Sequence, residues 1–149
     1  MNLFDKISND IKAAMLAKDV VRRETLRGVK KEFLEAKTAK GADGELSDDA
    51  ALKILSKMVK QRKESAKIYS EQNRQDLADN ELAEAAVIEE YLPKQLSEDE
   101  LQIAVKNIID SCGASSMKDM GKVMGIASKQ LSGKAEGKAI SEMVKKLLS

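Results

Sequence analysis

The side chains that carry out most enzyme chemistry are scarce in this sequence. It contains no histidine, which excludes an imidazole general base, a Ser-His nucleophile pair and a histidine-ligated metal site. The single cysteine, Cys112, falls in the last turn of an expected helix, where the helix dipole disfavours a thiolate. The adjacent carboxylates of Glu89 and Glu90 are typical of a solvated helix face. We therefore expect no catalytic residue, no bound cofactor and no metal site.

The residues that indicate binding are lysines placed beside glycines. Gly121 and Gly125 lie four residues apart in an expected helix, where each costs about 1 kcal/mol relative to alanine. Two explanations stay open: close packing against another helix, or close approach of a phosphate backbone. Lysines that would neutralise phosphate charge lie nearby, which supports the second explanation.

Two further segments can each be interpreted either as structural or as anion-binding. The segment GKAEGK (133–138) is either a helix–helix connection or an anion site at a helix N-terminus. The segment KQRKES (60–65) either pairs with an acidic helix or contacts phosphates. The candidate nucleic-acid-binding residues are therefore Lys118, Lys122, Lys129, Lys134 and Lys138, with Lys60, Arg62 and Lys63 as a secondary patch.

Composition bounds the class of protein and its compartment. The 149 residues include 26 basic and 25 acidic side chains, so a net charge of +1 provides no overall attraction to nucleic acid or membrane. One cysteine excludes an internal disulfide, which fits a reducing compartment. No apolar run approaches the roughly 20 residues that span a bilayer, and no signal peptide is visible. We therefore expect a cytoplasmic protein with no membrane partner.

Apolar residues at three- and four-residue spacing predict amphipathic helices, and thus an all-α fold. Asp19 and Ser47 are expected helix caps, Asn73 is an expected break and cap, and Gly113 is expected to end a helix in the left-handed conformation. Val21 and Leu82 are among the expected inward-facing residues. The helices should cover about 3–17, 19–37, 47–69 and 74–91 before the only proline, and 98–112, 117–130 and 136–148 after it.

The only proline marks a joint in the chain. Pro93 fixes φ and removes a backbone donor, while Ser97 with Glu100 forms a capping box. One helix must therefore stop near Leu92, and another must start at Glu98. We expect a packed hinge at 91–97. It would join an N-terminal helical bundle of about four helices (1–93) to a smaller C-terminal three-helix domain (97–149).

Five motifs, in this order, resemble those of the GatB/YqeY family. They are KQRKES (60–65), NRQDLADNE (73–81), EEYLPKQLSEDEL (89–101), ASSMKDMGKVMG (114–125) and GKAEG (133–137). Each motif alone is unspecific, but the ordered set is specific and covers essentially the whole chain. The resemblance implies an all-α fold of two helical domains joined at the Tyr-Leu-Pro hinge.

The resemblance also implies a function. Related domains form the tail of the B subunit of the tRNA-dependent amidotransferase and are appended to some glutaminyl-tRNA synthetases, where they are implicated in binding the tRNA body. We therefore expect a non-catalytic accessory protein that binds tRNA, with an amidotransferase or an aminoacyl-tRNA synthetase as a further partner. Two alternatives stay open: a protein–protein adaptor without nucleic-acid binding, and the family's label of carbon–nitrogen ligase with glutamine as amido-N-donor.

Overall fold

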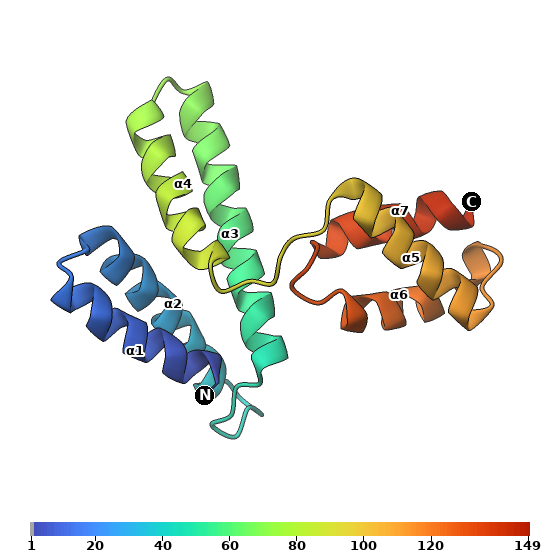
Figure 1. Ribbon diagram of the computed structural model, residues 1–149, viewed down its shortest axis with the longest axis horizontal. Coiled ribbons are helices and arrows are strands. Elements are labelled where there is room, and N and C mark those ends of the chain that lie inside the picture. The colour runs from blue at the N-terminus through green and yellow to red at the C-terminus, as the bar shows by residue number, and fades with distance from the viewer. Residues whose placement is uncertain (1) are drawn as a thin grey trace. The chain divides into compact units, whose positions relative to one another are not determined.

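The computed structural model describes residues 2–149, which form helices and the turns that join them (Figure 1). No strand occurs in these residues, so the predicted all-α class is confirmed. The chain divides into two compact units, one ending at Leu92 and the other spanning Pro93–Ser149. We call them the N-terminal unit and the C-terminal unit. The expected first domain begins at Met1, which lies outside the described residues.

The N-terminal unit consists of two helical hairpins. Helix α1 (Leu3–Leu16) lies against α2 (Val20–Thr38), and the long helix α3 (Asp48–Glu71) lies against α4 (Gln75–Glu89) (Figure 1). The helices bury their apolar stripes against one another, as amphipathic helices do in a small domain. The largest fully buried side chains of this core are Ile7, Leu26, Val29, Phe33, Leu55 and Ile88.

The C-terminal unit has a separate core. Its elements are α5 (Glu98–Cys112), the short 3-10 helix η1 (Met117–Asp119), α6 (Met120–Gln130) and α7 (Gly137–Leu148). Helix α7 contacts both α5 and α6. The core that these helices enclose is aliphatic and includes Leu101, Val105, Ile108, Val123, Ala127, Ile140 and Val144.

Local capping signals set several helix ends where the sequence predicts them. The side chains of Asp19 and Ser47 each accept a hydrogen bond, at 3.1 Å, from the backbone N–H three residues further on. Gly113 ends α5 with a φ of 70°, a left-handed conformation that glycine adopts without strain. The structure thus confirms these caps. They could be predicted because they depend on neighbours in the sequence rather than on tertiary packing.

Two predicted boundaries differ from the structure. Helix α6 begins at Met120 rather than at residue 117, because residues 117–119 form a 3-10 turn in which Ser116 Oγ accepts from the backbone N–H of Lys118 at 3.4 Å. Asn73 breaks the α3–α4 connection with a φ of 60°, but no side chain caps α4. The packing of α4 against α3 in their hairpin, rather than a cap, therefore fixes the start of α4.

Two predicted core residues are exposed. Val21 is 51% exposed because the inner face of α2 starts only at Thr25 and Leu26. Leu82 is 45% exposed because α4 carries apolar residues all round its circumference, so its sequence does not define one face. The buried residues of α4 are instead Ala78, Ala85 and Ile88.

Tyr91 connects the end of α4 to the first hairpin. Its hydroxyl donates to Asp10 Oδ2 at 2.5 Å and accepts from Arg22 Nη2 at 3.1 Å, while Arg22 Nη1 lies 2.5 Å from Glu90 Oε2. Burial and the hydrogen bond to Asp10 raise the pKa of the Tyr91 hydroxyl, so the phenol stays a donor throughout the physiological pH range. This network joins α1, α2 and the chain just before Pro93.

The first residues of the C-terminal unit are also held by polar contacts. Gln95 Nε2 donates to Gly133 O at 2.6 Å, and the backbone N–H of Leu96 donates to Lys134 O at 2.9 Å. Ser97 Oγ then accepts from the backbone N–H of Glu100, while the Glu100 carboxylate accepts from that of Ser97, both at 3.2 Å. The predicted capping box is confirmed, and it fixes the start of α5.

Replacing the phenol of Tyr91 should weaken the N-terminal unit. We expect Tyr91→Phe to lower its unfolding free energy by about 1–3 kcal/mol, because Asp10 and Arg22 lose a part-buried partner. Urea unfolding of the full chain measures this loss. Tyr69→Phe is the matched control, because the Tyr69 hydroxyl makes no hydrogen bond within residues 2–149. Equal stability of the two variants would contradict the role given to Tyr91.

Removing the helix cap at Ser97 should weaken the C-terminal unit. We expect Ser97→Ala to lower its unfolding free energy by about 1 kcal/mol. The hydrogen bonds from Ser97 hold the pKa of the Glu100 carboxyl below its ordinary value, so their stabilisation is present above that value. The backbone N–H of Ser97 is the largest cause of the lowered pKa, and Ser97→Ala keeps it, so the pH dependence is tested with Glu100→Gln. The difference between wild type and Glu100→Gln should shrink as pH falls through the lowered pKa. Thermal unfolding across an acidic pH series checks this; a pH-independent difference would contradict it.

Candidate nucleic-acid interface

One face of α6 brings together two glycines and two lysines that are binding candidates by their sequence pattern. Gly121, Lys122, Gly125 and Lys129 line a shallow surface groove together with Ile126 and Gln130. Both glycines are exposed, and a Cβ added at either would meet no other atom within 4 Å. Close packing against another helix therefore does not explain them within the described residues. The two lysines border a strip of bare backbone that is open to solvent.

Lys122 also has a structural contact. Its Nζ donates to the carbonyl oxygen of Cys112 at 3.1 Å. This carbonyl belongs to the last residue of α5, where the helix leaves its carbonyls unpaired and the dipole attracts a cation. Lys122 thus links α6 to the end of α5. Because its side chain is exposed and an ammonium has three donors, Lys122 can also donate to an external anion.

The other predicted lysines lie at two further places. Lys118 lies in η1, four residues before Lys122, and is exposed. Lys134 and Lys138 are exposed on either side of the start of α7, where Glu136 is the N-cap residue but makes no side-chain cap hydrogen bond. The structure brings Lys122 and Lys129 into one groove, whereas Lys134 and Lys138 border the uncapped start of another helix.

Unpaired charge distinguishes the C-terminal unit. Residues 93–149 carry nine lysines and seven carboxylates. Within these residues no lysine forms an ion pair with a carboxylate; the ion pairs of the described chain all lie in the N-terminal unit. The lysines of the C-terminal unit are therefore available to an external anion. Lys145 and Lys146, exposed in the last turn of α7, are not among the lysines predicted from the sequence.

The secondary patch is divided by the structure. Arg62 Nε lies 3.3 Å from Glu84 Oε2, an ion pair without hydrogen-bond geometry, and Arg62 Nη1 donates to Met58 O at 3.3 Å. Lys63 Nζ lies 3.0 Å from Glu89 Oε1. Both side chains thus face carboxylates of α4, as one of the two interpretations predicts. Lys60 is exposed and has no ion-pair partner in the described chain.

The described residues contain no arrangement typical of a metal centre. In residues 2–149, no group of three or more histidine, cysteine, aspartate or glutamate side chains could hold a metal ion. The Cys112 thiol is half-buried and lies 3.6 Å from the carbonyl oxygen of Ile109. None of the described helices is both long enough and apolar enough to cross a membrane.

Comparison with known proteins gives both a family match and individual relatives. The model of the family described as Yqey-like protein matches residues 4–148. The chain is similar to the proteins named "Altered inheritance of mitochondria protein 41, mitochondrial" of several yeasts. That of Meyerozyma guilliermondii is 46% identical over 89 residues, which is 58% of this chain and 44% of the relative. That of Lachancea thermotolerans is 34% identical over 114 residues, 70% of this chain and 58% of the relative. The chain thus spans about half the length of these two curated relatives.

The names of these relatives correct one prediction. They describe mitochondrial proteins, which contradicts the cytoplasmic location expected from the sequence. That expectation depended on the absence of a secretory signal, which has a basic segment followed by an apolar core. Mitochondrial targeting segments are instead amphipathic and rich in arginine and serine, so the criterion does not address them.

Proposed function

The chain belongs to the Yqey-like protein family, and from this premise we propose that it is a non-catalytic accessory protein that binds tRNA through its C-terminal unit. The observation that carries the proposal is the open face of α6, where Lys122 and Lys129 border two exposed glycines. A phosphate backbone can approach bare helix backbone more closely than a side chain would allow, and the lysines supply the neutralising charge.

The composition of the C-terminal unit favours recognition of the RNA backbone over recognition of bases. Residues 93–149 contain no aromatic side chain, so they offer no surface on which an unpaired base could stack. What they offer is lysine ammonium groups, all on long flexible side chains. These features suit contacts with phosphates and 2′-hydroxyls along a folded RNA, such as the body of a tRNA. A partner that handles the same tRNA, an amidotransferase or a synthetase, would add contacts of its own.

The start of α7 would provide a second contact on the same unit. Its first backbone N–H groups have no side-chain cap, and Lys134 and Lys138 lie beside them. A helix N-terminus attracts anions through these N–H groups and the helix dipole. A phosphate at this position would therefore complement the groove on α6. In contrast, Arg62 and Lys63 would contribute to binding only if they left their carboxylate partners on α4.

A salt-dependent tRNA titration tests this proposal. We expect the intact chain to bind total tRNA at low salt and the variant Lys118→Glu/Lys129→Glu/Lys134→Glu to bind more weakly. Its salt slope should be smaller by about one for each phosphate that is no longer neutralised. Lys122 is left unchanged because it holds the end of α5. The control variant Lys12→Glu/Lys18→Glu, in the N-terminal unit, should bind like the intact chain. Absence of tRNA binding by the intact chain at low salt would overturn the proposal.

The glycines allow a test that separates folding from binding. We expect Gly121→Ala/Gly125→Ala to stabilise the C-terminal unit by about 1 kcal/mol or more, because alanine favours helix and the added methyl groups meet no atom. The same variant should bind tRNA more weakly, because the methyl groups stand between the backbone and the phosphates. Thermal unfolding and the titration measure the two effects. Higher stability with unchanged affinity would show that the two glycines do not contact tRNA.

A second candidate function is that of a protein–protein adaptor. It is favoured by a groove between α5 and α6, next to the glycine–lysine face, to which Ala104, Ile108, Cys112 and Ile126 contribute apolar surface. The low net charge is also more typical of an adaptor than of a general nucleic-acid binder. Capture of an amidotransferase or a synthetase that persists after nuclease treatment, combined with no tRNA binding by the purified chain, would favour the adaptor.

A further inference from the structure

The turn between α1 and α2 exposes apolar side chains that the proposed function does not use. Met15 is 50% exposed, Leu16 86%, Val20 57% and Val21 51%. We call these four residues the α1–α2 corner. They come from the last turn of α1 and the first turn of α2, at the end of this hairpin (Figure 1). Four large apolar side chains are exposed within seven residues, whereas single exposed apolar residues need no explanation.

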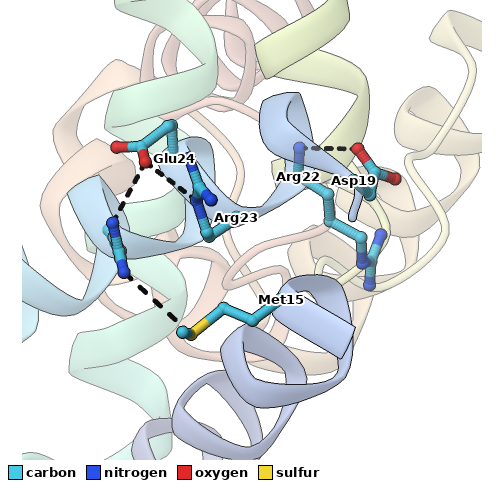
Figure 2. A network of polar contacts seen from close by, with 6 residues as sticks. Met15, Asp19, Arg22, Arg23 and Glu24 are labelled. Atoms are coloured by element: carbon cyan, nitrogen blue, oxygen red, sulfur yellow. Dashed lines mark hydrogen bonds and ion pairs between the residues drawn. The ribbon is translucent and has the colours of Figure 1, made fainter. Parts of the chain in front are cut away.

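The charges around the α1–α2 corner are mostly positive. Residues 12–27 include five basic side chains and two carboxylates. Figure 2 shows that both carboxylates are already engaged: Asp19 Oδ1 accepts from the backbone N–H of Arg22 at 3.1 Å, and Glu24 Oε1 accepts from Arg23 Nε at 3.0 Å. Glu24 Oε1 also accepts from Arg27 Nη1 at 3.1 Å. Arg22 pairs with Glu90, which follows α4, so the cationic side chains of this segment that have no carboxylate partner in the described chain are Lys12 and Lys18.

Two lysines of this segment are left without partners, and one arginine accompanies the apolar side chains. Lys12 lies one turn before Leu16 on α1, Lys18 lies in the turn itself, and both are exposed and make no ion pair in the described chain. Arg27 Nη2 lies 4.0 Å from the Met15 sulfur. Long cationic side chains beside apolar ones cover them in water and turn outward at an interface between water and an apolar medium.

The low net charge of the whole chain predicts no membrane partner, but a local surface can differ from the average: we propose that the α1–α2 corner docks on the surface of an anionic lipid bilayer. Leu16 and Val20 would enter the boundary between headgroups and acyl chains, where shallow insertion of apolar side chains contributes to binding. Lys12 and Lys18 would lie at the level of the lipid phosphates, whose negative surface potential attracts them. Exposed apolar side chains next to unpaired lysines complement both the apolar interior and the anionic headgroups of such a surface. This contact is independent of the proposed tRNA binding, which uses the other unit.

Vesicle flotation with the full chain tests the docking. The chain is mixed with vesicles of phosphatidylcholine alone, or of equal parts of phosphatidylcholine and phosphatidylserine. We expect it to float with the anionic vesicles and to stay behind with the neutral ones. Leu16→Asp should weaken partitioning into the vesicles by about tenfold, because a leucine side chain that enters the bilayer is replaced by a charged one. Lys12→Glu/Lys18→Glu should weaken it by a similar factor and make the remainder less sensitive to salt.

Matched controls keep the test decisive. Ile103→Asp changes an apolar side chain of similar exposure on α5, 62%, and should leave flotation unchanged. Circular dichroism shows whether each variant is folded; Val20→Asp replaces Leu16→Asp if that variant is not. Three results would overturn the proposal: no flotation with either vesicle, equal flotation with both, or equal losses in Ile103→Asp and Leu16→Asp. A concentration-dependent self-association that Leu16→Asp abolishes, without flotation, would identify the corner as a contact between proteins instead.

Discussion

The division of the structure into two units depends on Pro93, where the backbone can no longer continue as a helix. Pro93 has no N–H to donate, and its ring excludes the preceding residue from helical conformation. The residues on either side of it consequently bury their apolar side chains in two separate cores. Each core is small, and small domains bury too little apolar surface to be very stable. Polar contacts of about 1 kcal/mol each, such as the Ser97 capping box and the Tyr91 network, therefore matter more here than they would in a larger domain.

The division also separates two uses of charge. In the N-terminal unit, Arg22, Arg62 and Lys63 lie against carboxylates of the α4 segment. These side chains are partly exposed, so the pairs add modest stability, but they satisfy the charges of helices that must lie side by side. In the C-terminal unit the lysines form no such pairs, although the sequence provides acidic residues there. The near-neutral overall charge thus combines internally compensated helices with lysines that face solvent, which is why composition alone gives no indication of a binding surface.

Features that depend on neighbouring residues could be predicted from the sequence, and features that depend on tertiary packing could not. The caps at Asp19, Ser47 and Ser97 and the left-handed Gly113 are local, and the structure contains all four. The prediction that Leu82 faces inward is wrong because an all-round apolar helix does not define its inner face. The sequence offered two roles each for Arg62 and the glycines of α6, and only the positions of neighbouring helices distinguish between them.

The glycines of α6 give the strongest physical reason to look for a ligand outside the fold. Together Gly121 and Gly125 make α6 less stable by as much as about 2 kcal/mol relative to alanine, in a unit whose core is small. Glycines in helices are usually explained by a neighbouring helix that would clash with a side chain, and here no atom of the described chain occupies that place. Neither glycine has the positive φ that would otherwise require it. A destabilising feature without a structural reason inside the described chain is the physical basis of our proposal that a surface approaches α6 from outside, and the lysines on both sides are the reason for proposing an anionic one.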